Sequence, residues 1–341
     1  MEYICKPYIP EEGKVYEASI KAIKHKFKQM NKDNLVLIGQ SHGWVYKYVK
    51  ELNYNFKDSY VNCGLLLRIF REIVFRCNLP GKALFYNKDV ICNDKVLLVN
   101  ASLITHEYIK WLHDKCHNCK IILVYTNPVN PNYSPNSFLD SWCTKWTSDK
   151  DDAIKYNMHL FEGGGYFPQW KATKVAPIYD VFYIGKDKAR LERLHQIERD
   201  MNDHGVKTMF YITWNRGWQK KKDGIHKPFL PYERVLDYIG KSKAILHLLD
   251  GAQNGITLRI QESLIHKVKL ITDDVNITSY DFYNSHNIFI LGKDDMNNLR
   301  AFLDSPYENV ESDFFRHAYY DQMIEEVVEN SFKDFATSLE K

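Results

Sequence analysis

Short apolar runs alternate with stretches of helical periodicity along most of this chain, and this alternation limits the folds that it can adopt. From Asn34, the sequence NLVLIGQSHGWVYKYVKEL reads as a buried strand, a glycine-containing turn and a helix. Two further apolar runs, at 95–101 and 120–125, lie on either side of a helical stretch at 104–116. Strands that alternate with helices form a parallel sheet with helices on both faces. The N-terminal half therefore predicts one doubly wound α/β domain.

The same alternation begins again after a break. Residues 161–179 contain three consecutive glycines and two prolines, a composition that favours neither helix nor strand. Beyond the break, apolar runs predict four strands, at 181–185, 207–213, 244–249 and 269–274. Helical stretches at 188–205, 232–242 and 257–267 separate them. The C-terminal half therefore predicts a second doubly wound domain.

The 341 residues accordingly suffice for two domains of ordinary size. We predict an N-terminal Rossmann-like domain at 1–162, a linker at 163–178, a second Rossmann-like domain at 179–309 and a helical tail at 310–341. The tail is amphipathic, which predicts a helix that packs back onto the body of the protein. Its apolar face would contain Phe314, Ala318, Tyr319, Met323, Val327 and Val328.

The charge and composition of the chain limit the kinds of molecule that it is expected to bind. Basic and acidic residues, 46 and 43 of them, are mixed along the chain, which argues against a dedicated nucleic-acid binder. One basic cluster, at Lys220, Lys221 and Lys222, lies beside Trp218 in a stretch bounded by glycines. This cluster favours a solvated loop, with contact to a membrane surface or an acidic partner as the alternative.

The chain has no recognisable export signal. Residues 1–14 carry acidic side chains and two prolines where a secretion signal needs an apolar run, and no stretch approaches the roughly 18 apolar residues of a membrane span. The seven cysteines have no repeating spacing, which argues against a disulfide framework. We therefore expect a cytoplasmic protein, at most peripheral at the inner face of the membrane.

Two motifs that resemble metal sites are better explained as helix ends. Cys116 and Cys119 form a CxxC, but no second pair of ligands follows at the usual spacing. Asp149 and Asp151 form a DxD of the kind found in metal-dependent GT-A transferases, yet they precede a helical run that an Asp would cap. We expect no metal site at either motif.

The segment 250–274, DGAQNGITLRIQESLIHKVKLITDD, suggests an anion site. Gly255 lies in a loop after a strand, and Thr257 is placed to begin the next helix, whose free backbone N–H groups would favour a phosphate. Arg259 and Glu262 lie three residues apart and share one helix face. Arginine suits a phosphate and glutamate suits two ribose hydroxyls. The alternative is a helix with an ordinary surface ion pair. No GxGxxG follows the first strand and no GxxxxGK[ST] occurs, which weakens dinucleotide and P-loop interpretations.

Residues 179–304 resemble the C-terminal domain of bacterial GT-B glycosyltransferase-like proteins of lipopolysaccharide, capsule or O-antigen synthesis. The matching pieces include YDVFYIGKDKARLERL, the TMFYI strand, the stretch from PYERVLDYIG to KLITDD, and YDFYNSHNIFILG. In that group a Gly-Thr-Leu-Arg-x-x-Glu element lies against the nucleotide diphosphate and ribose. The resemblance thus implies a donor site made of Asn254, Gly255, Ile256, Thr257, Leu258, Arg259 and Glu262.

The resemblance also places three residues after the first strand of this domain. Gly185, Lys188 and Arg190 fall on the glycine and basic residues that could neutralise the pyrophosphate. The alternative for them is an exposed, charged helix start.

The N-terminal half resembles that group less, mainly in its strand pattern and in DDAIKYNMHLF at 151–161. In GT-B enzymes the acceptor and the catalytic base come from N-domain loops that face the interdomain cleft. His42, in the loop after the first strand, is the candidate base by position and by a pKa near neutrality. The alternative is an incidental loop histidine.

One position departs from the pattern of retaining GT-B enzymes. Those enzymes carry a glutamate, seven residues and a second glutamate, whereas Asn254 stands eight positions before Glu262 here. An amide cannot supply the same charge, which favours an inverting enzyme.

Taken together, these features predict a GT-B glycosyltransferase with two Rossmann-like domains facing a cleft. It would transfer a sugar from a nucleotide-sugar donor to a glycan or lipid-linked acceptor, without a cofactor or divalent metal. The alternative is a non-catalytic sugar-nucleotide or glycan-binding protein of the same fold. The sequence names neither the sugar, the acceptor nor the oligomeric state.

Overall fold

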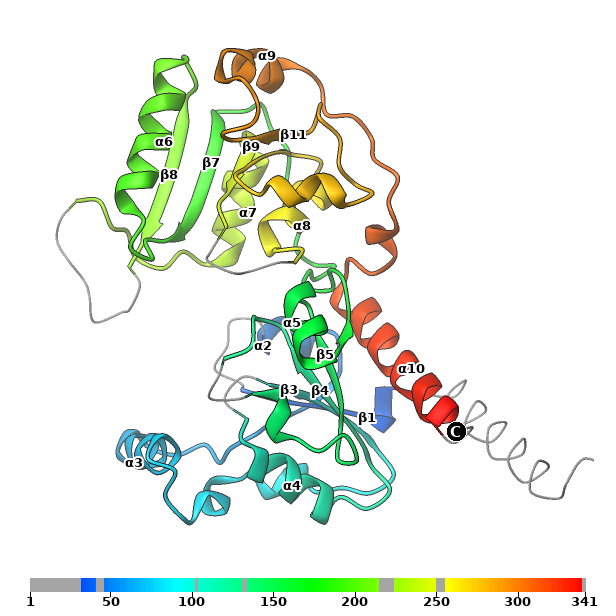
Figure 1. The fold of residues 1–341 in the computed structure, drawn as a ribbon. Helices are drawn as coiled ribbons and strands as arrows, with labels where there is room; N and C mark the ends of the chain where they lie inside the picture. Colours follow the sequence, from blue (N-terminus) through cyan, green and yellow to red (C-terminus); the bar gives the residue numbers. More distant parts are fainter. Residues whose placement is uncertain are drawn as a thin grey trace, which may run out of the picture. The chain divides into compact units, whose positions relative to one another are not determined.

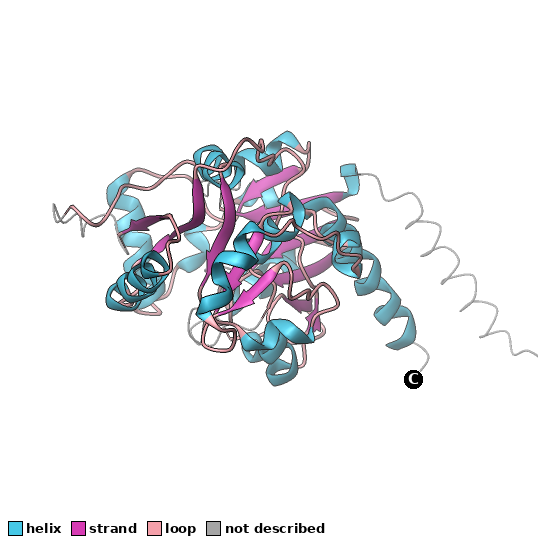
Figure 2. Ribbon diagram, turned by 90° about the horizontal axis from the view of Figure 1, so that it is seen from above, coloured by secondary structure: helices cyan, strands magenta, loops and turns pink. Residues whose placement is uncertain are grey.

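The computed structural model describes residues 32–40, 46–101, 104–130, 134–214, 224–249 and 255–338, with side chains as far as 332. The chain divides into two compact units. Unit 1 is Met1–Leu160 with Glu325–Lys341, and unit 2 is Phe161–Ile324. Helices and strands alternate along both units (Figure 1, Figure 2). The prediction of two doubly wound α/β domains is confirmed.

Unit 1 contains a six-stranded parallel sheet in the order β2-β1-β3-β4-β5-β6. The strands are β1 (Leu35–Gly39), β2 (Asn55–Asp58), β3 (Val96–Asn100), β4 (Lys120–Tyr125), β5 (Thr144–Thr147) and β6 (His159–Leu160). The helices between them are α2 (Tyr46–Glu51), α3 (Leu65–Arg76), α4 (His106–Lys115) and α5 (Lys150–Tyr156). Since β2 and β3 lie on opposite sides of β1, the strand order reverses between β1 and β3.

The core of unit 1 forms on the sheet because the central strands are apolar on both sides. Tyr108, Ile109 and Leu112 of α4 pack into the same cluster as alternate residues of β3 and β4, such as Leu97 and Leu123. The C-terminal helix α10 (Tyr320–Ser338) adds to this unit, because Trp146 Nε1 donates a hydrogen bond to Ser331 Oγ at 2.8 Å. Val327 and Val328 are buried. The predicted packing of the tail is confirmed.

Unit 2 contains a five-stranded parallel sheet in the order β11-β10-β9-β7-β8. The strands are β7 (Tyr179–Lys186), β8 (Thr208–Thr213), β9 (Ser242–His247), β10 (Lys269–Thr272) and β11 (Ile288–Ile290). The helices are α6 (Leu191–Asp203), α7 (Tyr232–Gly240), α8 (Leu258–His266) and α9 (Leu299–Asp304). Leu194 of α6 and Leu299 of α9 share one apolar cluster, whereas Tyr238 of α7 stacks on Phe182 from β7. The sheet is therefore covered on both faces.

Two predicted elements of unit 2 have different bounds in the structure. The helix predicted from 188 begins at Leu191, because Lys188 and Ala189 adopt left-handed φ values of 48° and 60° that a helix cannot contain. The strand predicted at 244–249 ends at His247. The residues beyond both ends form loops at the carboxyl edge of the sheet.

The glycine-rich segment predicted as a linker at 163–178 belongs to unit 2. Tyr166, Phe167 and Trp170 are buried there. Gly164 has a φ of 71°, and a Cβ at this position would lie 2.2 Å from Met323 Cβ, so only glycine fits. The segment has neither helix nor strand, as its composition predicts, but it packs as part of the domain.

Both motifs that resemble metal sites lie at helix ends, as predicted. Cys116 is the C-cap residue of α4. Asp149 is the N-cap residue of α5, and its Oδ1 accepts hydrogen bonds from the backbone N–H groups of Asp151 and Asp152, both at 3.0 Å.

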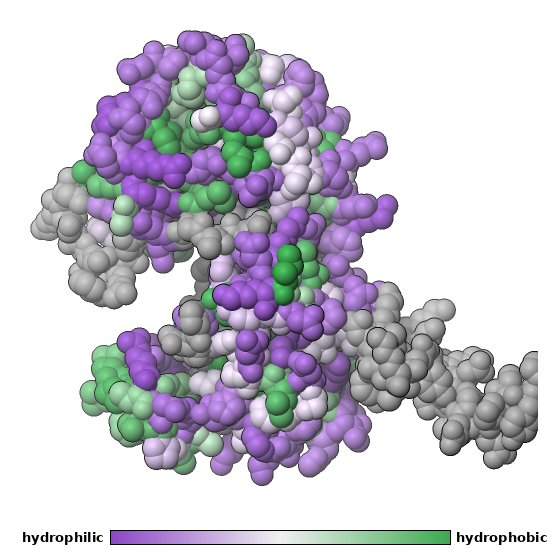
Figure 3. Space-filling view, viewed as in Figure 1, coloured by the Kyte–Doolittle hydropathy of each residue, from purple (hydrophilic) through white to green (hydrophobic). Residues whose placement is uncertain are grey.

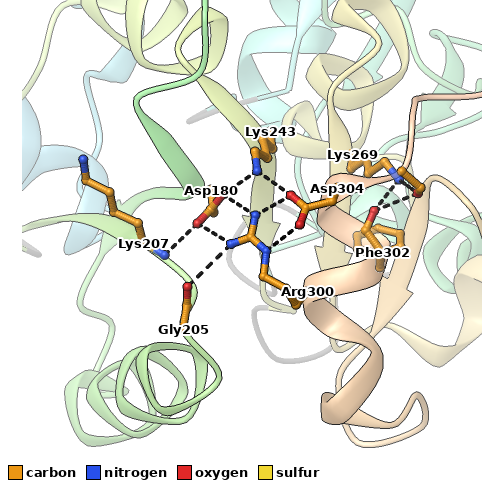
Figure 4. A network of polar contacts seen from close by, with 9 residues as sticks. Asp180, Gly205, Lys207, Lys243, Lys269, Arg300, Phe302 and Asp304 are labelled. Carbon is orange, nitrogen blue, oxygen red and sulfur yellow. Dashed lines mark hydrogen bonds and ion pairs between the residues drawn. The ribbon is translucent and has the colours of Figure 1, made fainter.

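A charged cluster ties together the amino ends of β7 and β9 in unit 2 (Figure 4). Arg300 donates to both carboxylate oxygens of Asp180, at 2.9 and 3.1 Å, and Lys243 Nζ lies 2.9 Å from the same side chain. The backbone N–H of Lys207 donates at 2.9 Å. Burial alone would raise the pKa of Asp180, but the hydrogen bonds from Arg300, Lys207 and Lys243 outweigh it and lower the pKa to about 2.

We predict that Asp180→Asn lowers the stability of unit 2 by about 2 kcal/mol, because it removes the negative charge that three donors share. Amide hydrogen exchange of β7 and β8 peptides in the full chain measures the opening free energy of this unit alone. Asp237→Asn is the matched control, since Asp237 pairs with Arg234 on the exposed side of α7 at 3.0 Å. Its effect should stay under about 0.5 kcal/mol. Equal effects of the two variants would contradict the assigned role of Asp180.

Candidate functional site

The sheet of unit 2 changes direction between β7 and β9. The chain leaves β7 for β8 on one side and then returns to β9 on the other. In open α/β sheets, the loops after the two strands at such a reversal separate and leave room for a ligand at the carboxyl edge. The loop at 187–190 and the segment at 248–257 follow these strands, so a binding site is expected at this edge.

Arg190 connects the two loops. Its Nη1 donates to the carbonyl oxygen of Leu249 at 2.9 Å and to that of Leu248 at 3.3 Å, both just beyond β9. Its Nη2 donates to Tyr183 Oη at 3.4 Å. A Cβ at position 185 would lie 2.5 Å from the same hydroxyl oxygen, so Gly185 makes room for Tyr183. Neither the predicted contact with the pyrophosphate nor the alternative of an exposed, charged helix start includes this structural role of Arg190.

Two buried donors at this edge have no hydrogen-bond partner among the described residues. They are Arg190 Nε and the hydroxyl of Thr257. Thr257 is the N-cap residue of α8, yet its side chain does not cap the helix. A buried donor without a partner costs about 1–3 kcal/mol, so such atoms need an explanation.

The N-terminus of α8 opens onto the same edge. Gly255, Ile256, Thr257, Leu258 and Arg259 are all partly exposed, whereas the next five residues are buried. The first N–H groups of a helix and its dipole favour a negative charge at this end. The predicted helix at 257–267 is observed at 258–266, which confirms the local interpretation of this segment.

Glu262 lies one turn further along α8 and is fully buried. Tyr232 Oη donates to its Oε1 at 2.6 Å, and Arg259 Nη1 donates to its Oε2. Burial raises the pKa of Glu262, against the opposing effects of Arg259 and Tyr232. Glu262 is therefore not part of an ordinary surface ion pair. The carboxylate has no exposed surface, and in the observed structure it holds Arg259.

Tyr232, packed against Trp170, supports the pair of Arg259 and Glu262. Tyr232 is the first residue of α7, and its ring lies 4.2 Å from that of Trp170, centroid to centroid. Burial raises the pKa of Tyr232 well above its usual value, and the charge of Glu262 acts in the same direction. The phenol therefore stays protonated and keeps donating to Glu262. The Arg259 side chain retains 20% of its surface exposed.

The charges of Arg190 and Arg259 both act on His247, the last residue of β9. Its Nδ1 lies 2.9 Å from Thr272 Oγ1. Burial lowers the pKa of His247 to about 4; Asp273 opposes this shift, and the charges of Arg259 and Arg190 add to it. The imidazole is therefore neutral at pH 7. The same two arginines oppose the effect of burial on the pKa of Tyr183.

The acidic side chains of this edge each have a partner, although Asp187 Oδ1 is buried without a hydrogen bond among the described residues. Asp273 Oδ1 accepts from the backbone N–H of Leu249 at 2.8 Å, and its Oδ2 accepts from Arg193 at 2.6 Å. Asp187 Oδ2 lies 3.1 Å from His226 Nε2. Lys188 lies in the left-handed turn next to Arg190, and burial lowers its pKa, followed by the charges of Arg190 and Lys186. The edge is therefore rich in cationic donors and suits an anionic ligand.

The structure brings together Gly185, Arg190, Thr257, Arg259 and Glu262, which the sequence analysis places in one site. Asn254 and His42 lie outside the described residues, as does the basic cluster at Lys220–Lys222. The chain position of His42 directly follows β1, which lies at the strand reversal of unit 1.

Sequence reasoning missed Tyr183, Tyr232 and His247. Tyr183 and His247 lie in apolar strands, where a single polar side chain reads as ordinary core. Tyr232 begins a helix 30 residues before Glu262, and only the folded sheet brings the two together. A signal for His247 was present, because it is a titratable residue near the end of a predicted strand at the ligand edge.

No protein-family model matches this sequence, and no curated protein matches it. Among solved structures, the fold is similar to AviGT4, a glycosyltransferase involved in avilamycin A biosynthesis, with a TM-score of 0.46 and 11% identity over 89% of this chain and 98% of that one. It is similar to T4 phage BGT in complex with UDP and Mn²⁺, with a TM-score of 0.42 and 13% identity over 89% and 98% of the two chains. It is also similar to the glycotransferase of kitacinnamycin, with a TM-score of 0.39 and 11% identity over 90% of this chain and 97% of that one.

Within the described ranges, no helix is both long enough and apolar enough to span a bilayer. The same ranges contain no group of three or more His, Cys, Asp or Glu side chains arranged to hold a metal ion.

We predict that the stability of unit 2 falls as the pH falls from about 6.5 to about 4. In this window an unfolded histidine binds a proton, whereas the buried His247 stays neutral, so the unfolded state binds more protons and is favoured. Burial gives His266 the same tendency. His247→Asn, which keeps a polar partner for Thr272, should flatten the slope by up to about 1.4 kcal/mol per pH unit.

Hydrogen exchange of β9 and β10 peptides, extrapolated to a common intrinsic rate at each pH, gives these slopes for wild type and variant. Parallel curves over this window would show that His247 does not titrate as its burial requires.

Proposed function

We propose that this protein is a glycosyltransferase and that unit 2 binds the nucleoside diphosphate part of a sugar donor. One observation carries the proposal. Arg190 binds the carbonyl oxygen of Leu249 at the reversal between β7 and β9, and the charges of Arg190 and of Arg259, at the partly exposed N-terminus of α8, both act on His247. A phosphate at this point would meet backbone N–H groups, a helix dipole and a guanidinium group together.

The side chains would share the work in distinct ways. Arg259, held by Glu262, would donate directly to the diphosphate, and Thr257 would donate through its hydroxyl. Arg190 would keep the two loops at a fixed separation, since its guanidinium group is already bound to the carbonyl groups after β9. Lys188 would add positive charge from the neighbouring turn. Neutral His247 would pack beneath this site without adding charge to it.

The acceptor side of the reaction follows from the GT-B resemblance of the sequence. We place the acceptor, a glycan or a lipid-linked sugar of cell-surface polysaccharide synthesis in a bacterial cytoplasm, at the carboxyl edge of unit 1. His42, directly after β1, would deprotonate the acceptor hydroxyl. With Asn254 near the place of the first glutamate of the retaining pattern, direct displacement with inversion is the favoured course.

Departure of a nucleoside diphosphate requires stabilisation of the negative charge that grows on it. In the proposed site, this charge meets fixed donors from α8 and the β7 loop, so a divalent metal is not needed. The DxD at Asp149 is used as a helix cap, with its Oδ1 bound to two backbone N–H groups.

We predict that the double variant Arg259→Gln/Glu262→Gln weakens nucleoside diphosphate binding about 10- to 100-fold. Replacing both residues removes the guanidinium group without leaving a buried, unpaired carboxylate, so the fold should persist. The loss of a charged hydrogen bond corresponds to about 1.5–3 kcal/mol. A thermal-shift screen of UDP, GDP, dTDP and CMP first identifies the nucleotide that binds. Calorimetric titration then measures its affinity for the wild type and for the variant.

Arg234→Gln is the matched control, because Arg234 forms a similar pair with Asp237 on the exposed side of α7. It should leave affinity unchanged. If no nucleotide stabilises the wild-type protein, or if both variants bind equally well, the donor site is misplaced. Donor binding without hydrolysis or transfer would favour a non-catalytic sugar-nucleotide binder.

We predict that transfer survives exhaustive EDTA treatment, whereas His42→Ala lowers turnover about 100- to 10,000-fold with donor affinity nearly unchanged. The reason is that the cationic donors replace the metal, while the base acts only on the acceptor. Radiolabelled sugar transfer, measured in one buffer with and without manganese, tests both. Loss of activity in EDTA that manganese restores would instead assign a metal-dependent mechanism.

A further inference from the structure

Helix α3 of unit 1 carries its apolar side on the outside. The inward side of this helix contains Arg71 and Val74, which are buried. Its outward side contains six large apolar residues, each close to half exposed or more: Leu65, Leu66, Leu67, Ile69, Phe70 and Ile73. Figure 3 shows the hydrophobic colour gathered over α3, at the lower left of that view. A soluble helix normally has the opposite arrangement.

The neighbouring turn at Lys82–Phe85 extends this surface. The ring of Phe85 lies 6.1 Å from that of Phe70 and 6.0 Å from that of Phe75, which fixes the turn against α3. Leu84, in the same turn, is 83% exposed. We call this surface the α3 patch and define it by Leu84 and the six apolar residues of α3. Continuous apolar surfaces of this kind mark interaction sites.

The inward side of α3 shows that the orientation is built in. Arg71 Nη2 lies 3.3 Å from Glu72 Oε1, and the guanidinium group of Arg71 lies over the Tyr60 ring at 5.2 Å. A charged residue on the inside thus has an ion pair and an aromatic partner. Rotating α3 to bury its leucines would break the contact between Arg71 and Tyr60.

The charges around the patch indicate the kind of partner. Helix α3 carries Arg68, Arg71 and Arg76 against a single acid, Glu72, which lies 3.3 Å from Arg71 and 3.8 Å from Arg76. Arg68 and Arg76 are exposed beside the apolar residues. A short amphipathic helix with leucine and phenylalanine on one side and arginine at its border is the pattern of helices that lie in the headgroup region of an anionic bilayer.

We propose that the α3 patch docks unit 1 onto an anionic lipid bilayer. The apolar side chains would enter the boundary between headgroups and acyl chains, and Arg68 and Arg76 would contact lipid phosphates. Helix α3 follows β2, so it begins at the carboxyl edge of the unit 1 sheet. A bilayer held there would bring a lipid-linked substrate to this edge; only this consequence rests on the proposed function. The docking itself requires no donor or acceptor.

Sedimentation of the full chain with sucrose-loaded vesicles tests the proposal. We expect binding to equimolar phosphatidylglycerol and phosphatidylcholine, and about tenfold or more weaker binding to phosphatidylcholine alone. Leu66→Gln with Ile73→Gln should weaken binding to the anionic vesicles about tenfold or more. Arg68→Gln with Arg76→Gln should weaken it severalfold and reduce its dependence on salt.

Ile154→Gln is the matched control, because Ile154 is 84% exposed but is the only exposed large apolar residue of α5. It should bind vesicles as the wild type does, and circular dichroism should show every variant folded. Failure of the wild type to sediment with anionic vesicles would overturn the proposal, as would equal binding to neutral ones or an equal loss in Ile154→Gln. A wild-type dimer that Leu66→Gln with Ile73→Gln dissociates, with vesicle binding unchanged, would assign the patch to a second copy of the chain.

Discussion

The reversal of strand order in each parallel sheet is the constraint on which the rest of the structure depends. A parallel sheet needs helices on both faces, so the chain must wind first to one side of its initial strand and then to the other. In unit 2 this separates the loops after β7 and β9, and Arg190 spans the separation by binding the carbonyl groups of Leu248 and Leu249. The site at this edge therefore follows from the topology before any ligand is considered.

Charged side chains have different roles at the two edges of the unit 2 sheet. At the amino edge, every strong donor around Asp180 has an acceptor within the protein, and the low pKa of Asp180 reflects stabilisation of its ionised form. At the carboxyl edge, Arg259 keeps part of its surface exposed, and the Thr257 hydroxyl lacks a partner among the described residues. A saturated network stabilises a fold, whereas donors left unsatisfied at a strand reversal are suited to a ligand.

Local features were predictable from the sequence, and long-range ones were not. The helix at 258–266, the four main strands of unit 2 and the cap at Asp149 follow from periodicity and capping chemistry, which act over a few residues. The burial of Glu262 could not be predicted, because it depends on Tyr232 from another helix. Helical periodicity also extended α6 too far, since nothing in Lys188 and Ala189 announces a left-handed turn.

Helix α3 shows why periodicity cannot say which side of a helix is buried. Its apolar residues together define an apolar side, and the usual inference is that this side faces the core. Here the core contact is made by Arg71, whose charge is neutralised by Glu72 and whose guanidinium group lies over Tyr60. Arg71 and Val74 thus occupy the inward side, and the leucines remain exposed. The apolar side is then free to serve a surface outside the chain, and the exposed arginines beside it favour an anionic one.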